Sequence, residues 1–282
     1  SNIINLLLDV LFVIVLHYEV TGLLLGPPAI ANITGFLAIL YFYAKHKPLP
    51  LTAVPLEKYF SGPTCRQMLQ CGSHLTVRMF CMIIMVNSFM HQSSAFGGEL
   101  LAANSILFQI QFIMGDILTG LSQAGAIYSG IAFGEHDRSM LNDTLRISFI
   151  WAIGFGLLQT VGYYCCRHAI LGCFTNLHSV IATAQQYDLF IAFFPLISAL
   201  GIVYYGVFNG ALYTRPICIS MLLTAGCYLT AYFTLIPLYG NIGLWLAFLI
   251  FYIARSSLFT VLRSQAAAKS SFGLISNMTA RS

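Results

Sequence analysis

The sequence predicts an all-α integral membrane protein built as a bundle of about eight transmembrane helices. Hydrophobic residues make up 58% of the 282-residue chain and charged residues only 8%, whereas an average soluble domain is about 25% charged. So few charged side chains cannot cover a water-facing surface. Apolar segments of about 20 residues, long enough to cross a ~30 Å hydrocarbon core, recur along the chain. The net charge of +4 is spread over several loops and gives no indication of a nucleic-acid partner.

The apolar segments fall into two groups separated by one long polar connection. The predicted membrane helices cover 3–18, 22–44, 68–92, 100–130, 145–165, 188–212, 215–236 and 241–262. The connection 45–67 contains four prolines and reads as a linker. We therefore expect two helices in 1–44, a linker in 45–67, a six-helix bundle in 68–263 and a disordered tail in 264–282.

The basic residues predict the orientation of these helices in the membrane. Most of them fall on one side of the predicted topology: Lys45, Lys47, Lys58, Arg66, Arg138, Arg146, Arg215, Arg263, Lys269 and Arg281. Arg167 alone falls clearly on the other side. Because cytoplasmic loops carry the excess of Lys and Arg, the linker and the C-terminus are predicted to be cytoplasmic, with the chain in the cell (inner) membrane.

A short internal similarity suggests repeated halves. The stretches 18–25 (YEVTGLLL) and 239–246 (YGNIGLWL) share the pattern Y-x-x-x-G-L-x-L, and each joins two apolar segments on the outer side. Repeated halves are the usual construction of secondary transporters. We therefore interpret 1–44 as the last two helices of an N-terminal bundle and expect four helices to precede it. The first residue, Ser1 rather than Met, agrees with that expectation.

A line of polar residues runs along the segment 100–130. Gln109, Asp116 and Gln123 are spaced by seven residues, which brings them to nearly the same side of a helix. Ser105 and Gly120 fall on that side as well, whereas Gln111 points elsewhere. Such a line either borders a water-filled cavity, where Asp116 titrates or meets cations, or makes structural contacts with a neighbouring helix.

The preceding segment carries a second polar line, formed by His74, Arg78, Ser88 and Gln92. The two segments join in a hairpin turn near residue 97, and Arg78 and Asp116 are equally far from that turn. A lone charge at the centre of a membrane helix costs about 2.5–3.5 kcal/mol on insertion scales. We therefore predict an Arg78–Asp116 ion pair in the inner half of the membrane, either beside a cavity or as a clamp between helices.

Three further residues extend the set of candidates. Asp9 lies within the first apolar segment. In the sixth segment Tyr205 lies four residues before Asn209, and we expect both of these side chains to face a bundle or a cavity. Asp188 is expected at the start of the sixth helix, where a carboxylate complements the helix dipole. The candidate cavity or transport residues are thus Asp116, Arg78, Gln109, Gln123, Asp9, Tyr205, Asn209 and His74.

Enzyme motifs are absent from the sequence in any convincing form. Ser122 lies in a G-x-S stretch, but every later His falls in a loop and cannot act as its base at the same depth. Zinc-protease, P-loop and dinucleotide-binding patterns do not occur. We therefore expect no enzymatic activity and no cofactor.

Four stretches together resemble the multidrug and toxic compound extrusion (MATE) family, in particular its DinF-type branch. The stretch 100–138 resembles the eighth helix through its A-A-N start and through Ser129, Gly130, Ala132 and Gly134. "NLLLDVLFV" resembles the fifth helix, "LTVRMF" the seventh, and "YGNIGLWLAFLIFYIAR" the twelfth. The resemblance covers nearly all of 2–263. It implies a MATE-type helical bundle of twelve helices around a central cavity, which exchanges H⁺ or Na⁺ for amphipathic compounds by alternating access.

The sequence departs from the family pattern at acidic positions. Thr119 precedes Gly120 where the family has Asp-Gly, Ala126 stands where it has Glu, and Tyr205 precedes Gly206 where it has a second Asp-Gly. The expected function is a secondary active exporter, coupled to H⁺ or Na⁺. Alternatives are a flippase-like exporter of a lipid-linked precursor, or an inactive remnant that serves as an interaction partner.

The expected partners follow from the same resemblance. They are membrane lipids and a small amphipathic substrate, and we expect a monomer. A cationic or neutral substrate is favoured because Arg78 is the single arginine expected deep within the membrane, while Arg255 is expected near a helix end.

Overall fold

The computed structural model describes residues 30, 32–41, 44–45 and 62–268. The chain divides into two compact units, Ser1–Cys65 and Arg66–Ser282. In the first unit the short apolar helix Asn32–Tyr41 lies within the predicted second span. The predicted first span, Asp9 and most of the predicted linker lie outside the described residues.

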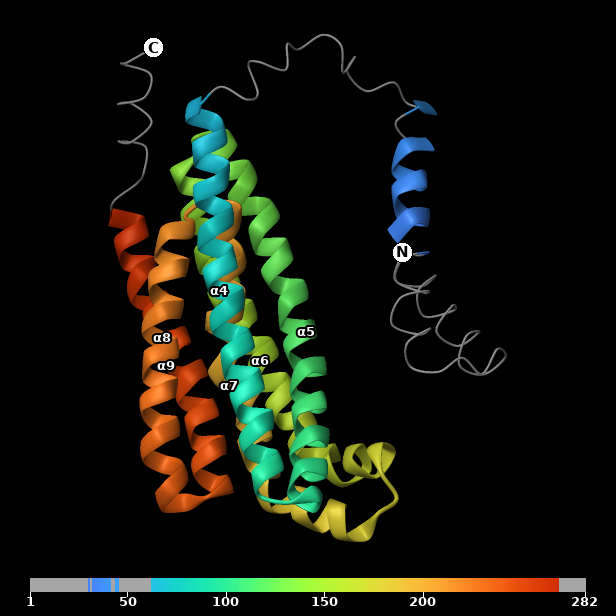
Figure 1. Cartoon of the computed structure of the whole chain (residues 1–282). Coiled ribbons are helices and arrows are strands. Elements are labelled where there is room, and N and C mark those ends of the chain that lie inside the picture. Colours follow the sequence, from blue (N-terminus) through green and yellow to red (C-terminus); the bar gives the residue numbers. More distant parts are fainter. Residues whose placement is uncertain (1–29, 31, 42–43, 46–61, 269–282) are drawn as a thin grey trace. The chain divides into compact units, whose positions relative to one another are not determined.

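The second unit is an antiparallel bundle of six long helices (Figure 1). The helices are α4 (Gly62–Ala95), α5 (Gly98–Gly134), α6 (Arg138–Phe174), α7 (His178–Gly210), α8 (Thr214–Tyr239) and α9 (Asn241–Ala268). All six are long and apolar enough to cross a membrane. The prediction of an all-α membrane protein is confirmed, and each predicted segment from 68 to 262 corresponds to one of these helices. α4 begins inside the predicted linker, and α9 continues past residue 263.

The connections between these helices are short, and α5 packs beside α6, α6 beside α7 and α8 beside α9. At the turn between α5 and α6, the Asp137 side chain accepts a hydrogen bond from the Met140 backbone amide at 3.1 Å. This contact caps α6 and satisfies one of the amides that a helix start leaves unpaired. The turn therefore ends one membrane-crossing helix and begins the next within a few residues.

Helix α7 lies at the centre of the bundle and contacts α5, α6 and α9. Its close contact with α5 depends on small residues: a Cβ added at Gly206 would collide with Ser122, and one added at Gly210 would collide with Ala126 and Ser129. The Ser122 hydroxyl also donates to the Ile202 carbonyl at 2.8 Å. Small residues let membrane helices approach closely, and such contacts replace the hydrophobic driving force that lipid does not supply.

Helix α7 also has an altered hydrogen-bond ladder near its middle. Pro195 has no backbone N–H to donate, and the Ser256 hydroxyl of α9 donates to the Ile197 carbonyl at 2.6 Å. The same hydroxyl accepts from the Gly201 amide at 3.1 Å. An uninterrupted α-helix would join that amide and that carbonyl directly. Helix α9 is therefore joined to the backbone of α7, one turn before Tyr205.

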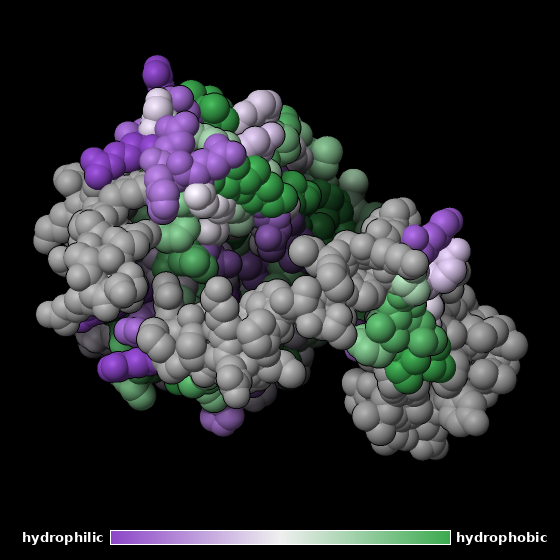
Figure 2. Space-filling model, turned by 90° about the horizontal axis from the view of Figure 1, so that it is seen from above, coloured by the Kyte–Doolittle hydropathy of each residue, from purple (hydrophilic) through white to green (hydrophobic). Residues whose placement is uncertain are grey.

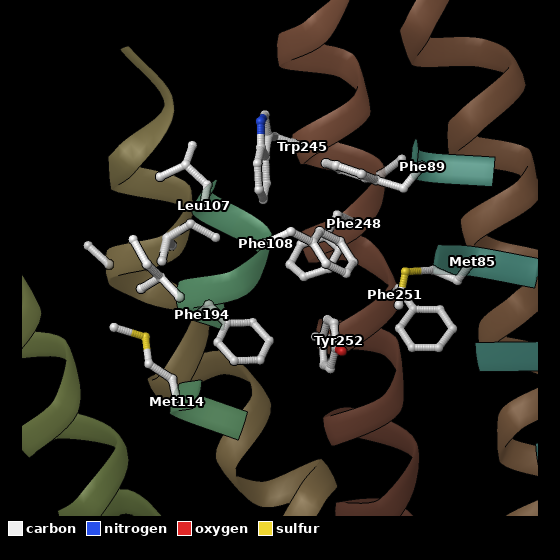
Figure 3. Close-up of a cluster of buried hydrophobic side chains, with 14 of the residues drawn as sticks. Met85, Phe89, Leu107, Phe108, Met114, Phe194, Trp245, Phe248, Phe251 and Tyr252 are labelled. Carbon is white, nitrogen blue, oxygen red and sulfur yellow. The ribbon is translucent and has the colours of Figure 1, made fainter. Parts of the chain in front are cut away.

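An aromatic core joins α4, α5, α7 and α9 (Figure 3). The ring of Phe89 from α4 lies 5.0 Å from Phe108 of α5 and 4.9 Å from Trp245 of α9, centroid to centroid. Phe194 of α7 contacts Phe248 of α9 at 5.9 Å. Aromatic pairs at such separations contribute about 0.5–1.5 kcal/mol beyond their buried area.

Buried amides lie beside this core, near the α4–α5 turn. The Asn104 side chain of α5 donates to Ser93 at 2.6 Å and to Asn241 at 2.7 Å, and its oxygen accepts from the Trp245 indole at 3.0 Å. This network connects α4, α5 and α9 at one end of the bundle. Its donors and acceptors are well matched, as a buried polar cluster requires.

Candidate functional site

The polar line of α4 faces inward, toward α7 and α8. His74 lies 3.0 Å from the Thr214 hydroxyl, and Ser88 lies 2.9 Å from the Tyr228 hydroxyl. Further along, the Tyr232 hydroxyl donates to the Gln92 carbonyl oxygen at 3.1 Å. These residues use their polar atoms to attach α4 to α8, so His74 makes a helix–helix contact.

Arg78, the charged member of that line, lies against Tyr205 of α7. Its guanidinium carbon is 3.9 Å from the centroid of the Tyr205 ring. The guanidinium carbon of Arg255, from α9, is 6.0 Å from the same centroid. Arg255 is only 3% exposed and lies well inside α9, so the expectation that it stands near a helix end is wrong. Two arginines thus share one aromatic ring in the interior of the bundle.

The predicted Arg78–Asp116 ion pair is wrong. Both residues are described, yet no ion pair or hydrogen bond joins them: Asp116 is exposed on α5, and Arg78 faces Tyr205. Equal distance from the hairpin turn predicts equal depth, but it does not predict how each helix is rotated about its own axis. Helix α5 presents Met114 and Leu118 to the core, which turns Asp116 to the opposite side.

The polar line of α5 therefore lies on the surface of the six-helix unit. Its members are all exposed: Ser105, Gln109, Asp116, Gly120 and Gln123. Among the described residues, no hydrogen bond or ion pair joins Gln109, Asp116 or Gln123 to another helix. Gln111, predicted to point elsewhere, is buried, and its amide donates to the Tyr252 hydroxyl at 3.5 Å. Gln111 thus points away from the polar line, as predicted.

The space-filling view shows that the surface of the chain is mixed in character (Figure 2). Purple hydrophilic residues gather on one side of the end seen from above, and green apolar residues adjoin them. On α5 itself, exposed apolar side chains flank the polar line, including Phe112, Ile113 and Ile127. The exposed face of α5 is thus neither uniformly apolar, as a lipid-facing surface would be, nor uniformly polar.

The remaining candidates lie near one end of α7. Tyr205 and Asn209 are half-buried, one turn apart. The structure therefore brings Tyr205 together with Arg78, whereas Gln109, Asp116 and Gln123 form a separate group on α5. Asp9 lies outside the described residues.

Sequence reasoning missed an ion pair between α6 and α7. An oxygen of Asp188 lies 3.5 Å from an Arg167 nitrogen, and Asp188 is 2% exposed. The expectation that Asp188 starts its helix is wrong, because α7 begins at His178 and Asp188 lies inside it. The first turns of α7 are polar (HSVIATAQQ), which made them look like a loop.

Together, the six membrane-length helices and their polar lines define a multi-pass membrane protein. The MatE family model matches residues 75–234, which is more than half of the chain. The chain belongs to the MatE family.

Known proteins agree with that assignment. DNA damage-inducible protein F of Escherichia coli (strain K12) is 25% identical over 255 residues, which cover 90% of this chain and 55% of that protein. This chain therefore spans about half the length of the curated relative it matches. The predicted DinF-type resemblance is confirmed by this match.

Solved structures show the same fold. The Vibrio cholerae MATE transporter VcmN in its bent form has a TM-score of 0.70 and 15% identity, covering 95% of this chain and 61% of that chain. A MOP superfamily transporter from Pyrococcus furiosus has a TM-score of 0.58 and 18% identity, covering 68% of this chain and 43% of that chain.

Proposed function

We propose that this chain forms part of a secondary active exporter of small amphipathic compounds, coupled to H⁺ or Na⁺ and working by alternating access in the inner membrane. Its C-terminus would face the cytoplasm. Membership of the MatE family and the likeness to MATE transporters support the export of drugs or toxic organic compounds.

The observation that carries this proposal is the outward polar line of α5. Asp116 is exposed, and no described residue pairs with it. Against acyl chains, such a carboxylate would cost about 2.5–3.5 kcal/mol. We infer that this face of α5 borders water or another polar surface along the transport path. Gln109 and Gln123 would then offer hydrogen bonds to a passing substrate, and Asp116 a charge to a cationic substrate or a coupling ion.

The substrate class follows from the same face. Asp116 favours a cationic or neutral amphipathic compound, and the exposed rings and aliphatic side chains beside it, such as Phe112 and Ile113, suit an apolar body. The arginines are not part of this face, because Arg255 is buried inside the bundle. Their charge therefore does not oppose a cation at Asp116.

Ethidium accumulation in bacteria that lack their own efflux pumps tests the proposal. The 282-residue chain and the longest reading frame that contains it would be expressed in parallel. We expect lower accumulation with a functional exporter, and Asp116→Asn should reduce the efflux rate several-fold. Asp143→Asn, at an exposed acid in the first turns of α6, is the matched control and should leave efflux unchanged. If neither protein lowers accumulation, the exporter proposal fails for these cargoes.

A further inference from the structure

The two arginines that share Tyr205 lack a counter-charge among the described residues. Arg255 is 3% exposed, and no described residue accepts a hydrogen bond from its guanidinium. The Nε atoms of both Arg78 and Arg255 are buried without a hydrogen-bond partner. For Arg78, the one contact of its guanidinium with an acceptor is weak: a terminal nitrogen lies 3.5 Å from the Met79 sulfur.

The acidic residues of the bundle do not supply that counter-charge. The described acids are Glu99, Asp116, Glu135, Asp137, Asp143 and Asp188. None of them forms an ion pair with either arginine. Asp188 is engaged with Arg167, and Glu99 accepts from the Thr183 hydroxyl at 2.7 Å. Three further acids, Asp9, Glu19 and Glu57, lie outside the described residues.

The Tyr205 ring by itself does not compensate the buried Arg255 and the half-buried Arg78. A cation over an aromatic face gains about 0.5–2 kcal/mol, whereas each unpaired charge within a membrane helix costs about 2.5–3.5 kcal/mol. The two guanidinium carbons lie 3.9 and 6.0 Å from the same ring centroid, so their like charges repel each other. A bound anion would convert this repulsion into attraction to a common partner.

Other polar atoms near the arginines add to this donor-rich environment. Tyr252 lies one turn before Arg255 on α9 and is buried. Its hydroxyl accepts from Gln111 at 3.5 Å, which leaves its own hydrogen available to donate. Each guanidinium carries five N–H donors and no acceptor, in a fork that matches a carboxylate. The Gln111 side-chain oxygen is a buried acceptor without a partner among the described residues, and a single neutral oxygen cannot neutralise two guanidiniums.

We propose that Arg78 and Arg255, from α4 and α9, form a binding site for one small monovalent anion, either chloride or the carboxylate group of a small organic acid. Tyr205 holds the two guanidiniums on a common ring, and Tyr252 adds a hydroxyl donor. The site is separate from the outward polar line of α5, and its occupancy does not depend on the proposed transport function. Binding would join α4, α7 and α9.

Thermal unfolding of the purified chain in detergent tests the site, with tryptophan fluorescence from the buried Trp245 and the exposed Trp151 as readout. Sodium methanesulfonate would be replaced by chloride or by acetate at constant ionic strength and pH. We expect one or both anions to raise the unfolding midpoint saturably, by about 2–5 °C. The anion that acts at the lower concentration identifies the preferred ligand.

Variants distinguish a site from a general salt effect. Arg255→Gln should abolish the rise, and Arg78→Gln should weaken the apparent affinity at least tenfold. Arg215→Gln, at an exposed arginine at the start of α8, should respond like the unmodified chain. Arg255→Met removes an unpaired buried charge, so its midpoint in methanesulfonate should be higher than that of the unmodified chain and insensitive to either anion.

Three results would overturn the proposal. The unmodified chain could have the same unfolding midpoint in all three salts, or Arg255→Gln could show the same rise as the unmodified chain. In the third result, the added anion does not change the midpoint, but Asp9→Asn, Glu19→Gln or Glu57→Gln lowers it, and only when Arg255 is present. A carboxylate of the chain itself would then be the counter-charge.

Discussion

At the scale of single residues, charged side chains connect the helices: Arg167 of α6 pairs with Asp188 of α7, and Arg255 of α9 lies beside the Tyr205 ring of α7. Arg167 and Asp188 lie in different helices, and nothing in the spacing of the chain connects them. The sequence predicted Arg255 near a helix end. In the structure, Ser256 instead donates into the backbone of α7 and Arg255 is buried. The sequence therefore shows which residues are polar, whereas only the packing of the helices shows which residues they pair with.

The Arg167–Asp188 pair allows a prediction at this scale. Removing one partner of a buried pair leaves the other charge uncompensated, at a cost of about 3–5 kcal/mol. Because Asp188 is the more deeply buried partner, Arg167→Leu should destabilise the chain strongly, and the double variant Arg167→Leu/Asp188→Leu should recover much of the loss. Unfolding midpoints in detergent measure both, with exposed Asp143→Asn as control. Additive losses in the double variant would show that the two charges do not interact.

At the scale of elements, the sequence predicted which helices exist more reliably than how each is rotated. Apolar length located all six helices of the second unit, because hydrocarbon admits polar backbone only when a helix satisfies it internally. The seven-residue spacing correctly grouped Gln109, Asp116 and Gln123 on one face of α5. It could not show whether that face turns toward α4. The close approach of α7 at Gly206 and Gly210 determines that rotation.

The contact between α5 and α7 carries the second prediction. A methyl group added at Gly206 would collide with the backbone and side chain of Ser122, which cannot move without shifting α5. Gly206→Ala should therefore destabilise the chain by about 1–3 kcal/mol, the usual cost of overpacking. The control is Gly120→Ala on α5, where an added Cβ would meet nothing within 4 Å. A lower unfolding midpoint for Gly206→Ala alone is expected; equal midpoints would mean that the helices separate at little cost.

At the scale of the whole molecule, composition sufficed to predict a membrane protein. Whether an outer face of the bundle contacts lipid or water depends on its surroundings, which the spacing of residues does not encode. An exposed side chain of the bundle faces either acyl chains or water. Ile150 of α6 and Gln123 of α5 are about equally far from the turn that joins the two helices, and both are exposed. The two residues therefore lie at a similar depth and differ in the helix face that carries them.

Cysteine labelling in intact cells distinguishes these faces. In a background with all eight native cysteines replaced, Gln123→Cys should react with a hydrophilic maleimide, because the polar line of α5 is proposed to border water. Ile150→Cys should react slowly, since a thiol among acyl chains is rarely ionised and the reagent does not partition there. Full denaturation in detergent, after which both thiols should label equally, controls for expression. Equal and slow labelling of both positions in cells would place Gln123 against lipid, and the inference drawn from Asp116 about the transport path would be lost with it.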